Sequence, residues 1–329
     1  MTDGKLRALD IRRDGSALVE LLEAAFTDEL ASKGHDIRQE FKTVRRMIPL
    51  ILFLGKFFGE LRHVFDGFVW EEDHRIVGAV AVQKMGNDAT RWIIGSVATH
   101  PDYRRRGIAR QLVLRAVEHA RVHGARCCVL DVRSDNEPAY QLYRSLGFQH
   151  YDSTTALKLE NLPSVQARPA PEGYRLRPMQ RSEWPARYEL ALRATPPQVQ
   201  AFFPVSEVEY RVTRQGWLLT WLLLRLQRLD EHAWAIEQDG ALLGTLRLLA
   251  KRAANPRHTL DLMLAPGPRD ALAEPLLTLA LEILEKYPRG LAMTSVRASD
   301  EELVSRLKQH GFAEIETLHR LGIKLVNDK

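Results

Sequence analysis

Residues 97–120 constrain the fold of this 329-residue chain most tightly, because three structural signals follow one another there. An apolar run ends at Pro101, which cannot donate to a β-ladder, and a turn of three arginines and Gly107 follows. Beyond the turn, apolar residues recur with the period of a helix at Ile108, Leu112, Val113, Ala116, Val117 and Ala120. The sequence therefore predicts a strand, a basic turn and an amphipathic helix.

The turn has the chemistry of a polyanion site. The first amides of a helix have no partner inside the helix, and the helix dipole adds positive charge at the same end. Gly107 omits the Cβ that would keep a phosphate away from the main chain, and the small Ala109 keeps the next turn open. We expect the amides of residues 105–110 to hold a phosphate group.

A second block, residues 127–148, predicts a buried strand followed by a short helix. The strand is apolar except at Asp131, whose carboxylate is expected to face inward, where it is costly unless paired or used. Asn136 is a candidate N-cap and Gly147 a candidate C-cap of the helix. The two adjacent cysteines that begin the strand are interpreted as core residues, not as metal ligands or a disulfide.

Together the two blocks resemble the GNAT superfamily of acetyl-CoA-dependent N-acetyltransferases, whose phosphate loop reads Arg/Gln-x-x-Gly-x-Gly/Ala. Arg104, Gly107 and Ala109 match that loop. The Leu-Tyr pair ending at Tyr143 and the closing Leu-Gly-Phe match the family's second half. The resemblance covers residues 97–148 and implies a GNAT fold of the α/β (α+β) class, a mixed sheet of about six or seven strands flanked by helices.

The resemblance also implies roles for individual residues. Tyr143 matches the family tyrosine that gives a proton to the CoA sulfur, and Asp131 has the spacing of a glutamate base in enzymes that acetylate a ribosomal protein. Water could relay the proton instead, and the alternative for Asp131 is a carboxylate paired with Arg133 or Arg104. The implied cofactor-binding residues are Val97, Ala98, Thr99, Arg104, Arg105, Arg106, Gly107, Ile108, Ala109, Arg110, Asn136 and Tyr143.

Simpler interpretations stand beside several of these roles. Tyr143 is alternatively an aromatic side chain packed on its helix, and Asn136 an N-cap alone. His74 and Glu72, in a predicted hairpin turn, are second candidates for the base, with solvated turn residues as the simpler interpretation. Residues 23–62 are expected to line the acceptor side. Their apolar run is too short to span a bilayer, which leaves a membrane-surface helix or burial against the other domain.

The sequence also contains an internal repeat. Residues 131–148 align without gaps on 295–312, and the predicted hairpin at 69–78 matches 235–244. The Pro/Gly-rich segment between the copies marks the joint. We expect a tandem duplication: a catalytic GNAT domain at 1–160 that binds acetyl-CoA, a linker at 161–173 and a second GNAT-like domain at 174–329.

The second copy has lost the phosphate turn. Pro268 and Pro275 remove amides, and Asp270 and Glu274 add negative charge. The positions of Asp131, Asn136 and Tyr143 are taken by Ser295, Asp300 and Leu307. We interpret the second domain as a degenerate GNAT fold without a cofactor site.

Composition limits the remaining possibilities. The net charge is +5, with 45% hydrophobic and 27% charged residues, as in an ordinary globular protein. No basic cluster is interleaved with aromatics, so we expect no nucleic-acid partner. The N-terminus lacks the pattern of a signal peptide, so we expect a cytoplasmic protein. We also expect neither a membrane span nor a bound metal.

The sequence thus predicts an acetyl-CoA-dependent N-acetyltransferase that moves an acetyl group directly to a primary amine of a small molecule. Two alternatives stay open: a protein N-terminal or lysine acetyltransferase, and a non-catalytic acetyl-CoA-binding regulatory module. Intact Arg104, Gly107, Ala109 and Tyr143 disfavour the regulatory module. We expect a monomer with pseudo-dimeric domains or a homodimer.

Overall fold

The computed structural model describes residues 4–26, 66–85, 88–211, 214–267 and 269–325. It divides into two compact units: unit 1 is Met1–His150 with Arg320–Lys329, and unit 2 is Tyr151–His319. In the described part of the chain, no helix combines the length and the apolar character that a membrane crossing requires.

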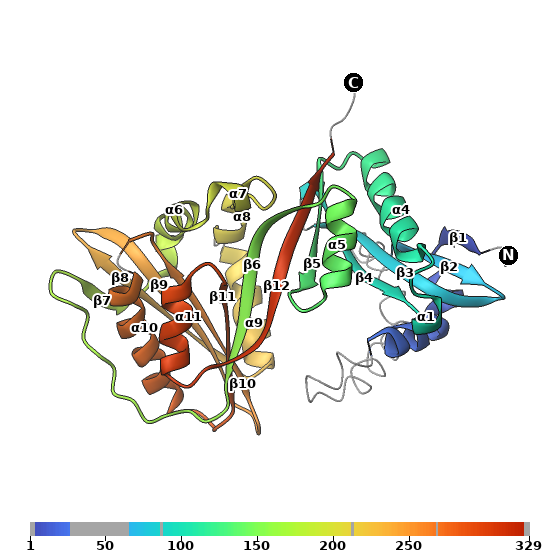
Figure 1. Ribbon diagram of the computed structural model, residues 1–329. Coiled ribbons are helices and arrows are strands. Elements are labelled where there is room, and N and C mark those ends of the chain that lie inside the picture. The colour runs from blue at the N-terminus through green and yellow to red at the C-terminus, as the bar shows by residue number, and fades with distance from the viewer. Residues whose placement is uncertain (1–3, 27–65, 86–87, 212–213, 268, 326–329) are drawn as a thin grey trace. The chain divides into compact units, whose positions relative to one another are not determined.

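Unit 1 is a mixed sheet with helices on both faces (Figure 1). Its neighbouring strands are, in order, β1 (Lys5–Ala8), β2 (Gly67–Glu72), β3 (Arg75–Met85), β4 (Asp88–Thr99), β5 (Cys127–Arg133) and the end of β12 (Ala313–Lys324). Strands β1 to β4 are antiparallel, whereas β4 and β5 run parallel. Helix α1 (Ile11–Ala25) packs on one face, and α4 (Ile108–Val122) and α5 (Glu137–Ser145) pack on the other.

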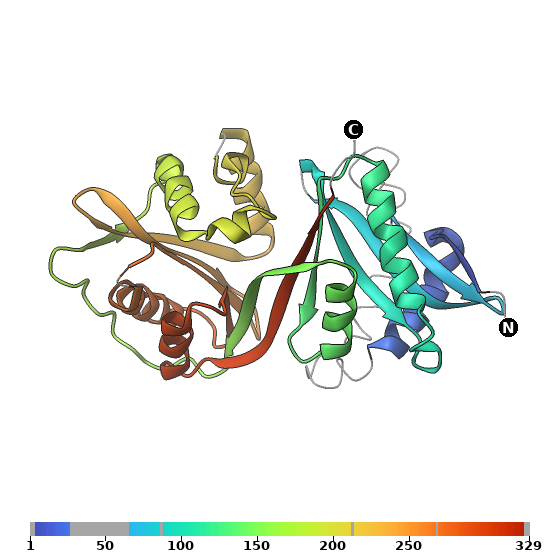
Figure 2. The same cartoon turned by 45° about the horizontal axis from the view of Figure 1, so that its top comes forward.

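Unit 2 repeats this plan (Figure 2). Its strands are β7 (Arg175–Pro178), β8 (Leu229–Gln238), β9 (Ala241–Lys251), β10 (Arg257–Leu264), β11 (Leu291–Arg297) and β6 (Gln149–Leu159). Helices α10 (Arg269–Leu284) and α11 (Glu301–Gln309) cover one face, and α6 (Trp184–Ala194) packs on the other. The short helices α7 (Pro197–Gln200) and α8 (Glu207–Tyr210) and the longer α9 (Arg214–Leu226) lie between α6 and β8 in the chain.

Matching ion clusters at the start of each copy confirm the duplication. In unit 1, Arg7 donates to Asp14 at 2.6 Å and to Glu71 at 2.6 Å, joining β1, α1 and β2. In unit 2, Arg177 makes the corresponding bonds to Glu183 at 2.9 Å and to Glu237 at 2.6 Å. The hairpins agree as well, because each carries a bulge immediately before the glutamate of its cluster. The fold is therefore a tandem duplication of one plan, as the repeat predicted.

The boundary between the units differs from the proline-rich joint expected at 161–173. Strand β6 pairs antiparallel with β11, and its Leu157 and Leu159 are buried in the core of unit 2. Strand β12 begins in unit 2 and ends in unit 1, where Leu321 and Leu325 are buried. Each unit thus takes its last strand from the other half of the chain.

The segment expected to be a linker belongs to unit 2, where it lies beside α10 (Figure 1). The Ala167 amide donates to Glu282 of that helix at 2.6 Å, and the Val165 amide donates to Glu285, the residue after the helix, at 2.9 Å. Proline and glycine marked an extended segment correctly, but the hydrogen bonds to α10 tie it to one unit.

We expect the Arg7 cluster to stabilise unit 1 more than the Arg177 cluster stabilises unit 2. Burial raises the pKa of Asp14, but hydrogen bonds from Arg7 and from the Asp10 amide outweigh burial and hold that pKa below its usual value. The native state therefore binds fewer protons than the unfolded chain, and the stabilisation, present above about pH 4, is lost as pH falls.

We expect Asp14→Ala to lower the free energy of unfolding at neutral pH by about 2 kcal/mol, because Asp14 is nearly buried and its loss leaves Arg7 partly uncompensated. The matched change Glu183→Ala, at a 26% exposed side chain, is expected to cost about 1 kcal/mol. Urea unfolding followed by circular dichroism measures both, and an equal loss in the two variants would contradict the burial argument.

Candidate active site

The start of α4 has the geometry of an anion-binding helix terminus. Gly107 is the N-cap at φ +80°, and no side chain caps the helix. The first bond across this turn runs from the Gln111 amide to the Gly107 carbonyl at 3.1 Å, so the amides of residues 108–110 precede it. The helix buries all six apolar residues of the predicted stripe, which confirms the period read from the sequence.

Space beside Gly107 is open. A Cβ built on this glycine would meet no atom within 4 Å, so only the left-handed backbone, and no neighbour, disfavours a side chain there. Arg105 also has a positive φ, of 63°, which gives the turn its sharp path. The exposed amides and the open space fit a large anion such as the pyrophosphate of a CoA molecule.

Two arginine side chains of the turn contact other parts of the protein, although the resemblance implied contacts with the cofactor. Arg104 donates to the Ala25 carbonyl at the end of α1 at 3.0 Å. Arg106 contacts Glu72 at 3.4 Å and lies over the Tyr103 ring. These contacts fix the turn against α1 and β2.

Glu72 is therefore not the solvated turn residue of the simpler interpretation. Its side chain is only 9% exposed and faces Arg106. His74, by contrast, is exposed at φ 60° in the turn between β2 and β3, as that interpretation expected. Arg110, the last arginine predicted to bind the cofactor, contacts the Ser145 hydroxyl on α5 at 3.2 Å.

Strands β4 and β5 stop pairing before the chain reaches this turn. They pair only from Arg91 to Ile93, opposite Cys127 to Val129, although both strands continue. Farther along, Ser96 takes a positive φ of 49° and shifts the register of β4 against β3. Val97, Ala98 and Thr99 follow the last β4–β5 pair, so the side of β4 that faces β5 carries main-chain groups outside that ladder. Such groups can bind an extended ligand as a strand would.

Tyr143 lies in the core of unit 1 rather than on its surface. It is 6% exposed, and its ring lies edge-on to Phe148 with centroids 6.0 Å apart. Burial raises the pKa of Tyr143 to about 12, so the phenol keeps its proton at neutral pH. Both interpretations of this residue, a packed aromatic and a proton donor, agree with this environment.

The expectation that Asp131 faces inward is wrong. Successive residues of a strand point to opposite faces, and on β5 the buried positions go to Leu130 and Val132, which pack in the same cluster as Tyr143. Asp131 lies on the other face with its side chain 44% exposed, so the structure does not bring it against Tyr143. Its Oδ1 is 4.0 Å from Nε of Arg320 on β12.

Arg320 is a residue that sequence reasoning missed. The expected partners have other contacts, since Arg104 binds Ala25 and Arg133 donates to Asp135 at 2.9 Å. No local motif pointed to Arg320, because its place beside β5 depends on the exchange of final strands. The repeat was the one available signal, and it does not reveal an exchange.

Two further predicted residues have clear structural roles. Asn136 accepts a hydrogen bond from the Ala139 amide at 3.3 Å and so caps α5, the simpler of its two interpretations. Cys128 is fully buried, and burial raises its pKa to about 12, which leaves an unreactive thiol. Among the described residues, no group of three or more His, Cys, Asp or Glu side chains is arranged to hold a metal ion.

In unit 2 the corresponding helix start is occupied by protein contacts. Glu274 on α10 meets Arg168 and His310 at 3.1 Å and Arg306 at 3.5 Å, so its charge is compensated within the unit rather than left to repel an anion. Arg269 pairs with Asp300, which caps α11. Pro268 and the side chain of Asp270 lie outside the described residues.

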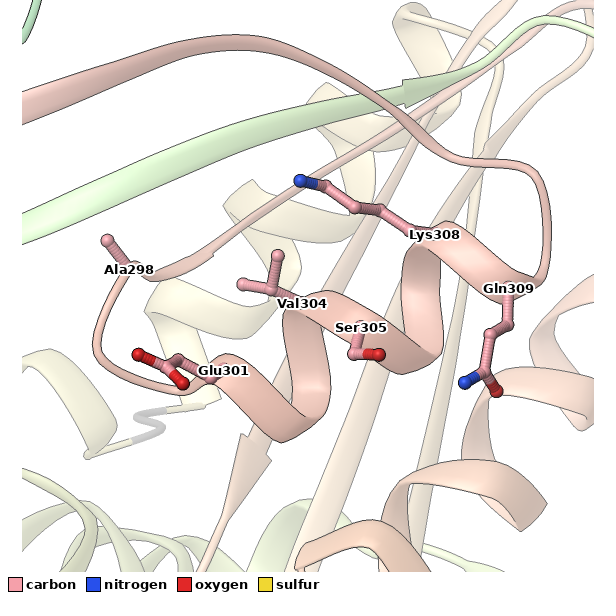
Figure 3. A pocket seen from close by; sticks show the side chains of 6 residues that line it. All are labelled: Ala298, Glu301, Val304, Ser305, Lys308 and Gln309. Carbon is pink, nitrogen blue, oxygen red and sulfur yellow. The ribbon is translucent and has the colours of Figure 1, made fainter.

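Two cavities lie in the described part of unit 2. One of 530 Å³ lies beside the Glu274 cluster. Another, of 490 Å³, is lined by α11 and the turn before it, and Figure 3 shows its lining residues Glu301 and Lys308 on this one helix. Most of the expected acceptor region at 23–62, including its apolar run, lies outside the described residues.

Comparisons with known proteins agree with this geometry. Residues 16–148 match the model of the acetyltransferase (GNAT) family. The chain is 33% identical over 99 residues to Acetyltransferase SG1711 of Sodalis glossinidius, which covers 30% of this chain and 68% of that protein. It is 44% identical over 57 residues to mycothiol acetyltransferase of Thermobifida fusca, which covers 17% of this chain and only 18% of that protein.

Solved structures that match nearly the whole chain include a tandem protein. It is a tandem GNAT protein from the clavulanic acid biosynthesis pathway, with a TM-score of 0.56, 18% identity, and coverage of 99% of this chain and 100% of that one. The chain belongs to the GNAT family of acetyltransferases, acyl-transferring enzymes that use acetyl-CoA. Within that family it has the tandem form, with two copies of the fold.

The environment of Tyr143 gives a direct test. We expect Tyr143 to remain a phenol at about pH 10.5, where an unperturbed tyrosine is largely ionised. The phenolate absorbance of the wild type and of Tyr143→Phe at that pH is therefore expected to be equal, with circular dichroism to show that both remain folded. A smaller phenolate signal in the variant would mean that Tyr143 titrates as an exposed residue does.

Proposed function

We propose that unit 1 is the catalytic copy and that it transfers the acetyl group of acetyl-CoA to a primary amine of a small molecule. The observation that carries the proposal is the uncapped start of α4 at Gly107, placed just beyond the point where β4 and β5 stop pairing. Strand β4 offers main-chain groups to a pantetheine arm. The amides that would bind the pyrophosphate come after this strand in the chain.

The donor side of the site uses the main chain. We assign Val97, Ala98 and Thr99 to the pantetheine arm and the amides of residues 105–110 to the pyrophosphate. The contacts of Arg104 with α1 and of Arg106 with Glu72 support this assignment, because they hold the turn in one conformation before the anion arrives. Acetyl-CoA, when bound, supplies an activated acetyl group as a thioester.

Two residues then handle protons. Asp131 accepts a proton from the ammonium group, directly or through water, and so frees the amine to form its bond to the acetyl carbon. Tyr143 gives its proton to the sulfur as the carbon–sulfur bond breaks, a role that fits a phenol kept protonated by burial. The exposed carboxylate of Asp131 also attracts a cation, which favours a polyamine-like or aminoglycoside-like acceptor.

We propose a structural role for unit 2. The Glu274 cluster and the Arg269–Asp300 pair use up charged groups at the helix starts that correspond to the donor site of unit 1. Pro275 within α10 removes a further amide. We therefore expect each chain to bind one molecule of acetyl-CoA, in unit 1.

Calorimetric titration of acetyl-CoA tests the donor site. We expect one site per chain and a loss of affinity of about 100-fold or more in Gly107→Glu, because the new carboxylate lies against the anion at the helix start. Gly124→Glu is the matched control, since Gly124 has the same kind of φ, of 84°, and the same open surroundings near the other end of α4. Two sites would show that unit 2 binds acetyl-CoA, and no binding would reject the proposed function.

Kinetics test the two proton-handling residues. In a thiol-release assay with spermidine, kanamycin and a short peptide as acceptors, we expect Tyr143→Phe to lower kcat about 100-fold. The KM for acetyl-CoA is expected to change little, because phenylalanine keeps the packing against Phe148. Unchanged kcat in this variant would leave Tyr143 as a core residue only. Fastest turnover of the peptide would favour a protein acceptor.

A further inference from the structure

We propose that Arg320, at the end of the last strand of the chain, is a positioning residue of the acceptor site in unit 1. It keeps Asp131 ionised and holds its carboxylate beside the gap between β4 and β5. The inference rests on the proposed function, because Asp131 matters here as the base of that reaction.

Strand β12 is firmly anchored in unit 1 where it carries Arg320. Leu321 is fully buried in the core of unit 1 and Leu325 is 5% exposed. The Leu325 amide donates to the Arg126 carbonyl at 2.8 Å, just before β5 begins. Because Leu321 points into the core, strand alternation directs Arg320 to the opposite face.

That opposite face is also the face of Asp131. Leu130 and Val132 occupy the core side of β5, so Asp131 projects away from α4 and α5. It stands two residues beyond Val129, where pairing with β4 ends. The guanidinium and the carboxylate thus meet at 4.0 Å at the edge of the gap, with both side chains partly exposed.

Other charged groups on this face have their own contacts. Arg133, on the same strand and face, donates both to Oδ1 and to Oδ2 of Asp135. Arg91 on β4 is opposite Cys127, at the far end of the strand, and is buried. Among the described residues, Arg320 is a cation within 4.0 Å of the Asp131 carboxylate.

A guanidinium at this distance stabilises the ionised carboxylate. Only the ionised carboxylate can accept a proton from an ammonium group, and the guanidinium keeps that form present to lower pH. The pair also gives the second half of the chain a part in the chemistry of the first, since β12 begins in unit 2 and supplies both core residues and Arg320 to unit 1.

Selective carboxyl labelling of aspartate and a pH titration by NMR test the pair without an acceptor. Asp131→Asn assigns the signal. We expect Arg320→Gln to raise the titration midpoint of Asp131 by about 0.5–1 pH unit, a range reduced for the exposure of the pair. Arg320→Lys is expected to restore most of the shift. Arg121→Gln, at an exposed arginine of α4 that pairs with Glu118, is the control without effect.

The same variants then enter the kinetic assay with the acceptor that turns over fastest. We expect the acidic limb of kcat/KM to move upward in Arg320→Gln by the same amount, while calorimetry shows acetyl-CoA binding unchanged within about threefold. An unmoved NMR midpoint, or lower activity with an unmoved acidic limb, would overturn the proposal and make Arg320 a structural residue. A shifted midpoint in a chain that binds no acetyl-CoA would uphold the ion pair and reject the proposed function.

Discussion

The arrangement of unit 1 depends on the burial of Leu321 and Leu325, which come from the far end of the chain. These two residues complete the core on the side of β5 that α4 and α5 cover. With them comes the Arg320–Asp131 pair, whose two members lie far apart in the sequence. A unit that takes its final strand from the other half of the chain would lose buried apolar surface if that half were removed.

The proposed donor side depends on hydrogen bonds that the fold leaves unformed. The ladder between β4 and β5 ends early, and α4 begins without a side-chain cap. Each of these would be a cost in an ordinary core, since polar main-chain groups need partners. In the proposed site they bind the ligand, and the contacts of Arg104 and Arg106 keep the turn in place.

The two copies diverge at this same place. Unit 2 retains the framework, including the Arg177 cluster that repeats the Arg7 cluster. It differs where unit 1 is open, because Glu274 and its cationic partners occupy the surroundings of the helix start. The two copies thus share interactions that build the fold and differ at the helix start that the proposed donor site uses.

The sequence alone determined the local parts of this protein. The apolar period of α4 and the N-cap at Asn136 depend on nearby residues and appear where predicted, and Gly147 takes its left-handed conformation directly after the C-cap of α5. Tertiary structure decided what depends on distant partners: the inward or outward face of Asp131, the contacts of the arginines and the exchange of β6 and β12. A strand of either copy fits either sheet by its pattern, so only the packing of both cores selects which sheet it joins.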